Sequence, residues 1–494
     1  MADADRDFIT WLRERGMPAA PEVSVDVVYG GAFSVKDYYM ESGNPRQMRG
    51  ASQLLMEAAE AFAAYTYFAC GAEVFLIAPQ GAGADLARGL EEVFREKTIT
   101  GQAAAVWRED IQVKDLLHAE RFDALWRGLN DDFYARRMMI FPAVDKPQDN
   151  RRCPGCNFRD IHTNGLCVSC HKRQEKGRGA RAGYRQECLD YGKDTLGIAL
   201  SLDETYEKEN SIELLADGSG DFALLYADVN NLGAAGKKLG GNVQRRRAFT
   251  RAVQATVKAA LYTAALKAVR AGGKMAFEII AAGGDDICAL LPGDIALLAG
   301  TLLLEEFDRC WKGHANEYGM LTISAGIAVG QAKTPILYMR ETAEQLLKIA
   351  KRKAWDRGCS CLDILSLNSD GQWATKIKDK LRADLRFIEE NQIANCTMRP
   401  YTAGQARKAL QWLNHDIAPS TLHSIAEVLL RCGIAEGNLW FRYLLSRQND
   451  PALANMAKDI APGCGMFYKG DGGELISPWL DLAQLRGQRG GDVC

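Results

Sequence analysis

The chain has 494 residues, of which 47% are hydrophobic and 25% are charged, close to the average of soluble globular proteins. This length predicts three or four domains, and the composition excludes a chain that is disordered throughout. The formal net charge of -2 excludes nucleic-acid binding through overall charge, so such contacts would need local patches or partner subunits.

The composition also bears on cellular location. No apolar run of about 18 residues or more is present, so no membrane span is expected. The start, MADADRDFITWLRERG, lacks a basic segment followed by an apolar run, so no secretory signal is expected. Four of the 14 cysteines form two CxxC pairs. This pattern favours a reducing cytoplasm, one metal site and otherwise buried thiols.

The first part of the chain mixes strand and helix patterns. Residues 23–30 (VSVDVVYG) predict a strand, residues 51–70 a helix and residues 73–78 (EVFLIA) a second strand. Helical periodicity continues to about Met139. Between residues 146 and about 190 the composition changes to Cys, Arg, Gly and Asn, which indicates a separate small module.

The two CxxC pairs lie in this module. They stand ten residues apart and comprise Cys153, Cys156, Cys167 and Cys170. Four thiolates at this spacing predict a tetrahedral structural zinc, and the alternative is a degenerate knuckle with reduced thiols. His162 and His171 lie close by but are not expected to be ligands, because four sulfurs complete the shell.

A basic run follows the second cysteine pair. Residues 171–185 (HKRQEKGRGARAGYR) hold six Lys or Arg against one Glu. The run could contact nucleic-acid phosphates or be a solvated loop. The polar, acidic stretch 203–220 predicts a loop or linker, and Arg245–Arg247 the exposed start of a helix.

Residues 221–367 carry the clearest pattern. Strands are predicted at 221–228, 275–282, 287–291, 321–329 and 361–367, and helices at 243–271, 295–312 and 341–354. The order β-α-β-β-α-β with additions is the ferredoxin-like unit, whose sheet has one helical face. Past Asp370 the sequence shows helical periodicity with breaks at Pro400, Pro419 and Gly433, which predicts a helical bundle.

An acidic turn joins two of these strands. Gly283, Gly284, Asp285 and Asp286 lie at the tip of the predicted hairpin, and the first strand of such a sheet, ending at Asp228, lies beside it. Two ionised carboxylates a few ångströms apart repel by roughly 4 kcal/mol at an effective dielectric near 20. Three converging carboxylates suit Mg²⁺ or Mn²⁺ in a two-metal nucleotidyl-transfer site. The alternative is a type I′ turn with solvated acids.

Two further segments are candidates for nucleotide contact. Backbone amides of residues 230–233, just after Asp228, could cradle phosphates, and Lys351 on a later helix could balance their charge. The alternative for Asn230 and Asn231 is that they merely form a turn.

Several segments together resemble one known family. YADVNNLG, FEIIAAGGDDICALLP and SAGIAVGQAKTPI with AEQLLKIAK look like the palm domain of the large polymerase subunit of type III CRISPR effector complexes. RGASQLL (residues 49–55) is similar to that family's first, divergent palm, and TMRPYT (residues 397–402) resembles the start of its C-terminal helical domain. The resemblance covers nearly the whole chain from about Val23.

The resemblance implies an α+β protein with two ferredoxin-like palm domains, a zinc-binding module between them and a C-terminal helical bundle. We expect a divergent, non-catalytic palm at residues 1–145, the zinc module and a linker at 146–200, the palm with the GGDD motif at 201–370 and the helical domain at 371–494.

The resemblance also implies an activity. The second palm would convert ATP into cyclic oligoadenylate second messengers when a cytoplasmic, RNA-guided antiviral complex binds target RNA. ATP and other protein subunits would be partners, with crRNA and target RNA held mostly through those subunits and no membrane involved. Asp228, Asp285 and Asp286 would hold Mg²⁺ or Mn²⁺. The nucleotides would lie against Asn231, Gly233, Gly283, Gly284 and Lys351, with Ser52 and Ser324 facing the two adenines.

Three departures from the family pattern stand out. At the place expected to correspond to GGDD, the first palm reads APQG (residues 78–81). Many members begin with an HD nuclease domain, whereas only about 22 residues precede the first palm here; His415-Asp416 lies far downstream, so no DNase activity is expected. Asn230 stands where the family often has a second aspartate.

Two alternatives remain from the sequence. The chain could be a catalytically idle scaffold subunit of such a complex. It could also be a diguanylate-cyclase-like enzyme that uses GTP, although such enzymes generally pair two single-palm chains and end the acidic turn in Glu-Phe, where this chain has Asp286-Ile287.

Overall fold

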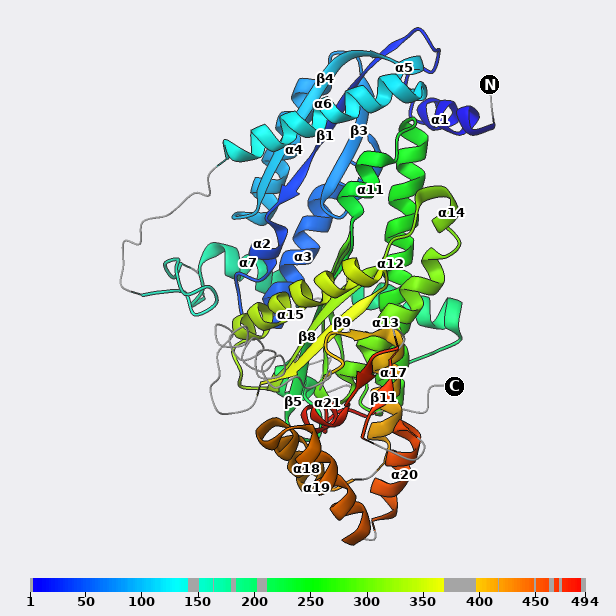
Figure 1. The fold of residues 1–494 in the computed structure, drawn as a ribbon. Coiled ribbons are helices and arrows are strands. Elements are labelled where there is room, and N and C mark those ends of the chain that lie inside the picture. The colour runs from blue at the N-terminus through cyan, green and yellow to red at the C-terminus, as the bar shows by residue number, and fades with distance from the viewer. Residues whose placement is uncertain are drawn as a thin grey trace.

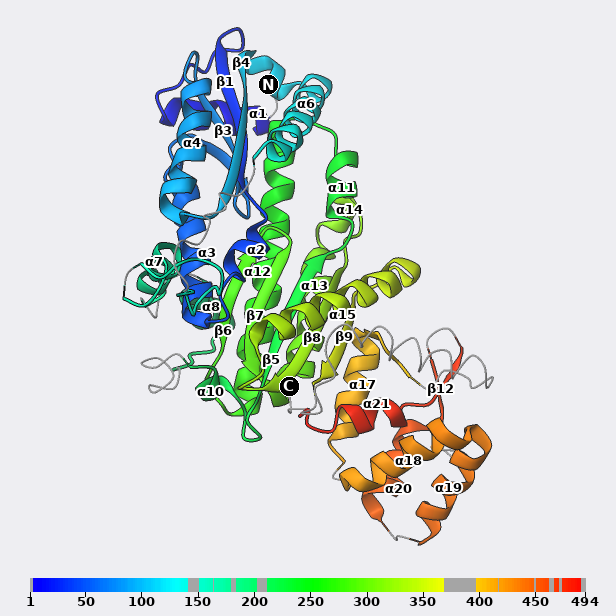
Figure 2. The same cartoon turned by 90° about the vertical axis from the view of Figure 1, so that its left-hand side faces the viewer.

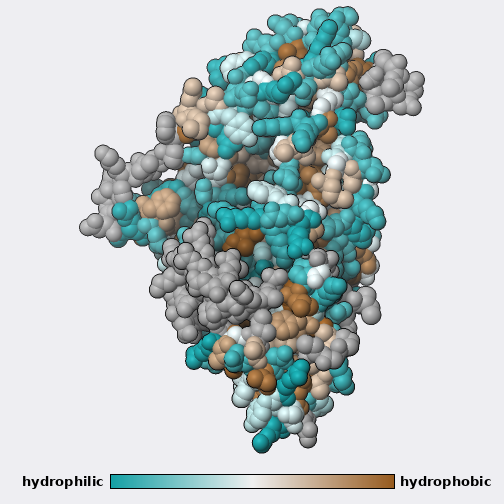
Figure 3. Space-filling view, viewed as in Figure 1, coloured by the Kyte–Doolittle hydropathy of each residue, from teal (hydrophilic) through white to brown (hydrophobic). Residues whose placement is uncertain are grey.

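The computed structural model describes residues 3–140, 151–162, 164–178, 184–201, 211–367, 397–415, 417–447, 450–461, 466–470 and 473–489. Figure 1 shows two sheet-containing parts arranged one above the other, with a group of helices below them. Among the described residues, none of the helices combines the length and apolar character that crossing a bilayer requires. On the face in Figure 3, hydrophobic residues form separate patches among hydrophilic ones.

The first sheet is antiparallel, with strand order β2-β3-β1-β4. Its strands are β1 (Ser24–Phe33), β2 (Thr66–Cys70), β3 (Glu73–Pro79) and β4 (Gln102–Gln112). The helices of this part are α1 (Asp3–Glu14), α2 (Val35–Tyr39), α3 (Pro45–Glu60), α4 (Gly83–Thr98), α5 (Val113–Leu117) and α6 (Ala119–Met138). Helices α3 and α4 cover one face, and α1 and α6 cover the other.

Two strands of this sheet were not predicted. The helix expected at 51–70 ends at Glu60, and Thr66–Cys70 instead forms strand β2. Strand β4 lies where helical periodicity was expected, because its first half (QAAAV) is rich in alanine, a strong helix former. Here a Cβ atom on Gly30 would collide with β4, so the small residues of β4 fit its close approach to β1. Tertiary pairing has overridden local propensity.

The second sheet has strand order β10-β9-β8-β5-β7-β6. Its strands are β5 (Asp221–Val229), β6 (Glu278–Gly283), β7 (Asp286–Pro292), β8 (Ile323–Gln331), β9 (Cys361–Ser366) and β10 (Tyr401–Thr402). Its helices are α10 (Ile212–Leu215), α11 (Leu232–Lys238), α12 (Val243–Gly272), α13 (Ala296–Trp311), α14 (Ala315–Tyr318) and α15 (Ile336–Arg357). The elements predicted for residues 221–367 are confirmed to within a few residues.

The two sheets share a hydrophobic core. Alternate residues of β5 point to opposite faces, so Ala223 and Leu225 pack against α12 and α13. Phe222 and Leu224 face the other way, into a core that also contains residues of α15, β1, β3 and α3. Asp228 lies an even number of positions after Phe222 and Leu224, so its side chain lies on the same face of the sheet. The end of β5 therefore presents its carboxylate on the face where the two palms meet.

The cysteine module lies against the first palm. It includes α7 (Val168–Lys176), α8 (Tyr184–Tyr191) and the short π-helix η1 (Gly192–Leu196). Figure 2 shows α7 beside α3. The two helices approach closely, because a Cβ atom on Gly50 would collide with the Arg173 carbonyl and one on Gly177 with the Arg46 carbonyl.

The basic run 171–185 has contacts that its pattern did not indicate. Residues 179–183 lie outside the described part of the chain. Arg173 is buried and pairs with Glu41 at 2.5 Å. Arg185 is also buried, with its Nη1 3.3 Å from Glu278 Oε2, and Arg49 binds the same carboxylate. Arg173 and Arg185 of the basic run therefore bind the module to the first and the second palm, and they are not part of a solvated loop.

The prediction that residues 245–247 form the exposed start of a helix is wrong for Arg246. This side chain is buried, and its guanidinium carbon lies 4.8 Å from the ring centre of Trp126. Arg247 lies 4.4 Å above the ring of Tyr67 in the same way. The N-terminal end of α12 packs on the first palm, and desolvated cation–π contacts take the place of hydration.

The C-terminal part is mainly helical (Figure 2). It comprises α17 (Ala403–Leu413), α18 (Pro419–Cys432), α19 (Ile434–Arg447), α20 (Pro451–Ile460), α21 (Trp479–Gln484) and the short strands β11 (Tyr468–Lys469) and β12 (Leu475–Ile476). The breaks predicted at Pro419 and Gly433 are confirmed, whereas Pro400 precedes β10 of the second sheet. Asp416 lies outside the described residues, and His415 pairs with Asp459. The predicted fold class is confirmed.

Candidate active site

Strand register brings the predicted acidic residues together. Asp228, at the end of β5, lies directly opposite Asp286 at the start of β7 and opposite Ser324 of β8. Side chains paired in this way share a face of the sheet, with Cβ atoms about 4.5–5.5 Å apart. Asp285 is in the loop beside them, and its carbonyl accepts a hydrogen bond from Val229 N at 3.2 Å. The three aspartates therefore lie next to one another in the fold, at one edge of the palm interface.

The acidic turn is a two-residue hairpin loop. Gly283 pairs with Asp286, which leaves Gly284 and Asp285 as the loop. Of these two, Gly284 alone has a positive φ, +67°. A type I′ turn needs a positive φ at both positions, whereas type II′ needs it only at the first and favours glycine there. The type I′ alternative is therefore wrong.

The carboxylates are only partly hydrated. Burial raises the pKa of Asp285 to about 7, and the charges of Asp286 and Asp228 add to this effect. Burial also raises the pKa of Asp286, although Lys36 opposes the shift. A cluster whose ionised form is disfavoured by both desolvation and repulsion fits a divalent cation, which relieves both costs. The donor set therefore fits Mg²⁺ or Mn²⁺.

Two lysines and a tyrosine hold the outer sides of this cluster. Lys351 of α15, a residue predicted from the sequence, has its Nζ 2.8 Å from Asp228 Oδ1. Lys36 of α2, which the sequence analysis missed, has its Nζ 3.0 Å from Asp286 Oδ1. The Tyr226 hydroxyl donates to the same oxygen at 3.3 Å. Cations from two different parts of the chain thus neutralise part of the acidic cluster.

Asn230 and Ser324 interact with each other beside the acids. Asn230 Nδ2 donates to Ser324 Oγ and to Thr322 Oγ1, both at 2.9 Å, and both Asn230 and Ser324 are buried. The Asn230 amide thus binds Ser324 of β8 and the residue that precedes this strand.

The other predicted nucleotide contacts lie at the palm interface or near it. Asn231 is exposed and, with φ of +61°, forms the N-cap of α11, which contains Gly233. Ser52 is a buried residue of α3 in the first palm. Gly283 and Gly284 contact the first palm, since a Cβ atom added at Gly71 would lie 3.5–3.6 Å from their backbone. The tips of the two palm hairpins therefore touch.

The comparison of these two tips corrects one prediction. In the first palm, Cys70 and Glu73 close the β2–β3 hairpin just as Gly283 and Asp286 close β6–β7. The segment that corresponds to GGDD is therefore CGAE (residues 70–73), and the placement at residues 78–81 is wrong, because those residues follow β3. The missed strand β2 caused this error. One acid, Glu73, remains at the tip of the first palm.

The two palms also agree in register around the tips. Glu73 lies opposite Gly31 as Asp286 lies opposite Asp228. Two residues earlier on each central strand, the Tyr29 hydroxyl donates to Glu73 at 2.6 Å, as Tyr226 does to Asp286. YGGAFSVK (residues 29–36) thus corresponds to YADVNNLG (residues 226–233), which places Lys36 at the position of Gly233. This alignment is the signal that could have pointed to Lys36.

The cysteine module presents a second candidate metal site. All four predicted ligands are buried, and their sulfur atoms lie within 4.8 Å of one another: Cys153, Cys156, Cys167 and Cys170. Backbone N–H groups of Cys167 and Cys170 donate to the sulfurs of Cys153 and Cys167 at 3.2 and 3.4 Å. Hydrogen bonds from the Cys167 and Cys170 thiols lower the pKa of Cys156. This donor set fits a structural zinc ion.

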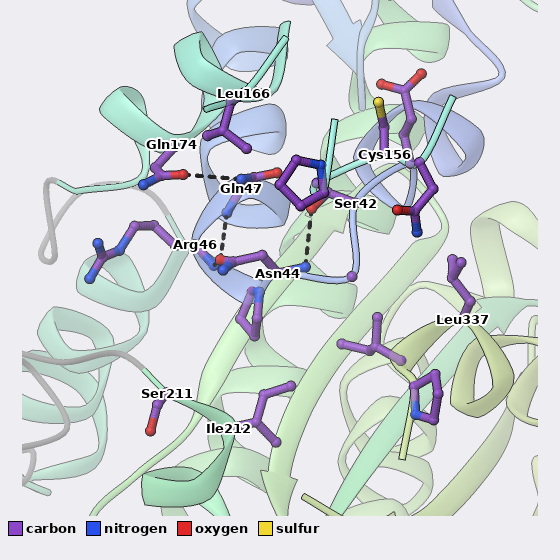
Figure 4. Close-up of a pocket in the computed structure, with 18 of the residues that line it drawn as sticks. Ser42, Asn44, Arg46, Gln47, Cys156, Leu166, Gln174, Ser211, Ile212 and Leu337 are labelled. Carbon is purple, nitrogen blue, oxygen red and sulfur yellow. Dashed lines mark hydrogen bonds between the residues drawn. The ribbon is translucent and has the colours of Figure 1, made fainter. Parts of the chain in front are cut away.

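A separate cavity of about 670 Å³ lies between the cysteine module and both palms (Figure 4). Its wall includes Asn44 and Gln47 at the start of α3, Gln174 of α7 and Leu337 of α15. Gln47 Nε2 donates to Gln174 Oε1 at 3.1 Å across this junction. None of the three aspartates lines the cavity, so it is distinct from the acidic cluster.

Comparison with known proteins gives one family match and several similar structures. The profile of the family described as "Cas10/Cmr2, second palm domain" matches residues 221–358. No curated protein matches the chain by sequence. A crystal structure of Csm1 in T. onnurineus is 13% identical with a TM-score of 0.56, and the match covers 94% of this chain and 70% of that one.

Two further similar structures hold nucleotides. A Csm1–Csm4 cassette in complex with cA3 is 12% identical, with a TM-score of 0.51 and coverage of 96% and 72%. A Csm1–Csm4 cassette in complex with pppApApA is 14% identical, with a TM-score of 0.50 and the same coverage. Residues 221–358 therefore match the second palm domain of the Cas10/Cmr2 family, and the fold of the chain is similar to that of Csm1.

Proposed function

We propose that this chain is the nucleotidyltransferase subunit of a type III CRISPR RNA-guided complex and makes cyclic oligoadenylates from ATP when target RNA is bound. The observation that carries the proposal is the position of Asp228, Asp285 and Asp286 at the adjoining ends of β5 and the β6–β7 hairpin, where the two palms meet. The domain bounds expected from the sequence form part of this proposal, with the family match lying inside 201–370.

The three aspartates would hold two Mg²⁺ or Mn²⁺ ions. Such ions lower the pKa of an attacking hydroxyl and neutralise the charge of a departing pyrophosphate. Lys351, already 2.8 Å from Asp228, would keep positive charge next to the phosphates. We assign no side chain as a general base, because bound ions would themselves lower the pKa of the attacking hydroxyl.

The reaction joins two nucleotides at a time. The 3′-oxygen of one ATP forms a bond to the α-phosphorus of another, the α–β anhydride bond breaks, and pyrophosphate leaves. Repetition gives a linear triphosphate such as the pppApApA found in a similar structure. Attack by its terminal 3′-hydroxyl on its own α-phosphorus breaks the last α–β anhydride bond, releases pyrophosphate and closes a ring such as cA3.

The remaining site residues bind and orient nucleotides in this proposal. The exposed amides around Asn231 and Gly233 would contact phosphates, and Gly283 and Gly284 would allow a close backbone approach. Ser52 and Ser324 would face the two adenines, one from each palm. Because both serines are buried, they would limit the size of the base more than bind its edge.

Partners follow from the similar structures. Csm1 is seen with Csm4, so we propose that this chain binds a Csm4-like subunit, with crRNA and target RNA held mainly by other subunits. A zinc ion at the four cysteines would support the fold. We propose no HD nuclease activity for these residues.

The test is product analysis with a double substitution. The purified complex is incubated with ATP, Mg²⁺ or Mn²⁺ and target RNA, and the products are identified by mass spectrometry. Asp285→Ala with Asp286→Ala should abolish a product that wild type makes. Asp85→Ala is a matched control, because Asp85 forms a solvent-exposed ion pair with Arg88.

The same assay decides between the alternatives. A wild-type complex that makes no product under any activator is an idle scaffold. A product made from GTP in preference to ATP indicates a diguanylate-cyclase-like enzyme. Product that survives the double substitution would exclude the acidic cluster as the site of reaction.

A further inference from the structure

One cation at the acidic cluster comes from the first palm. Lys36 lies on α2, just after β1, and reaches across the palm interface to Asp286. Its Nζ also lies 4.9 Å from the ring centre of Tyr226 on β5. The ammonium group therefore contacts Asp286 and lies over a residue of the strand that carries Asp228.

The fold does not require a cation at this position. The corresponding residue of the second palm is Gly233, which has no side chain. The backbone nevertheless takes the same path in both palms, because Ser34 and Asn231, three residues after Gly31 and Asp228, are both left-handed N-caps. The side chain of Lys36 is 38% exposed, and an ion pair of this exposure contributes little to stability, on the order of 1 kcal/mol or less. Beyond offsetting part of the charge of the aspartates, packing and stability therefore leave the lysine without an explanation.

The charges present when metal ions and a nucleotide are bound would give Lys36 a role. Two divalent ions carry more positive charge than Lys36 and Lys351 together, so they would compete with both ammonium groups for the carboxylates. A lysine displaced from Asp286 would remain beside any triphosphate bound there, and phosphate oxygens are strong acceptors for an ammonium group. Because Lys36 lies on the short helix α2, it stays at the palm interface whether or not it contacts Asp286.

We propose that Lys36 is a further active-site residue, which binds the phosphate chain of the nucleotide held at Asp286 and takes a cation's place on that carboxylate when the nucleotide is absent. This inference rests on the proposed function. It means that the first palm supplies charge to the reaction as well as a surface for a second nucleotide.

The proposal predicts effects of opposite sign for one substitution. In Lys36→Gln, the neutral side chain no longer competes with metal, so Mn²⁺ alone should bind several-fold more tightly. The same variant lacks a phosphate ligand, so a non-reactive ATP analogue with an α,β-methylene bridge should bind about tenfold more weakly in the presence of Mn²⁺. Damage to the fold would weaken both. Lys36→Arg keeps the charge and should restore part of the analogue affinity.

Lys114→Gln is the matched control. Lys114 also belongs to the first palm, forms an ion pair with Glu22 and is 39% exposed, close to the 38% of Lys36. Binding of Mn²⁺ and of the analogue is measured by calorimetry on the complete wild-type and variant chains, with thermal unfolding as the check on folding. The control should match wild type in both titrations.

The outcomes separate this inference from the proposed function. If Mn²⁺ binding to wild type is lost in Asp285→Ala with Asp286→Ala, the acidic cluster holds metal; Lys36→Gln behaving as wild type then overturns this inference alone. Equal weakening of metal and analogue binding in Lys36→Gln also overturns it. If wild type binds no metal that depends on these aspartates, the proposed function itself fails.

Discussion

At the scale of single residues, Asp228 shows how like charges are tolerated in the acidic cluster. It lies opposite a like charge, Asp286, an arrangement that destabilises a sheet. Lys351 and Lys36 offset this repulsion from two sides. The sequence predicted the three acids and Lys351, since strand ends and a helix carry them in a recognisable order. It did not predict Lys36, because that contact depends on how one palm packs on the other.

A second buried acid allows a prediction about pH. Asp481 of α21 accepts hydrogen bonds from Thr397 Oγ1 at 2.7 Å, Met398 N at 2.8 Å and the Tyr401 hydroxyl at 2.9 Å. Burial nevertheless raises its pKa to about 6. The folded state thus binds the proton more tightly than the unfolded state does, so the contribution of Asp481 to stability is present below about pH 4 and is lost as pH rises to about 6.

Asp481→Asn removes this titration. The opening free energy of α21 in wild type minus that in the variant should fall by roughly 2–3 kcal/mol between about pH 4 and pH 7, since one pKa unit corresponds to about 1.4 kcal/mol. Native-state hydrogen exchange at the two pH values, corrected for intrinsic rates, measures it. A difference independent of pH would show that Asp481 is not protonated in this range.

At the scale of elements, the second palm was predictable and the first only in part, since its strands β1 and β3 were expected but β2 and β4 were not. Strands β5 to β9 are apolar runs bounded by glycine or charged residues, so their sequence pattern predicts strands and no other element. In the first palm, β2 continues the apolar pattern that follows α3, and β4 begins with an alanine run. Both are strands only because a neighbour pairs with them. The missed β2 also misplaced the tip of the first palm, since the hairpin was then counted from the wrong strand.

The packing of α15 on β8 leads to a prediction at this scale. A Cβ atom on Gly326 would collide with the Ala343 carbonyl and with Leu347 N, so the helix backbone rests directly on the strand. Gly326→Ala should push α15 outward, lower the free energy of unfolding by about 1–3 kcal/mol and move Lys351 away from Asp228, with loss of product.

Gly404→Ala is the control for this substitution. It lies on α17, where an added Cβ atom meets nothing within 4 Å, so stability should stay the same or rise slightly. Thermal unfolding and the product assay measure both effects. Wild-type stability in Gly326→Ala would contradict the close contact between α15 and β8.

At the scale of the whole molecule, the cysteine module fastens the two palms together. Its α7 packs on α3 of the first palm, and its Arg185 shares the buried Glu278 of β6 with Arg49 of α3. Removing one partner from a buried ionic cluster typically costs about 3–5 kcal/mol. The sequence predicted the metal ligands from their spacing, but the buried role of the basic run depends on contacts between distant segments.

Metal removal should therefore have effects beyond the module. The chain as purified should contain one zinc ion per molecule by elemental analysis, and Cys156→Ser or a strong chelator should remove it. Hydrogen exchange should then accelerate in α7 and also in α3 and β6, while α18 in the C-terminal part stays unchanged. Acceleration confined to residues 151–178 would show that the module does not support the palm interface.

The unequal hairpin tips have a consequence for the polarity of synthesis. A pair of identical palms would offer two equivalent reaction centres, and either nucleotide could then donate or receive. Here one tip carries Asp285 and Asp286 while the other carries Ala72 and Glu73. In the proposed reaction, only one of two facing nucleotides would therefore lose its pyrophosphate, so each growing chain would lengthen in a single direction.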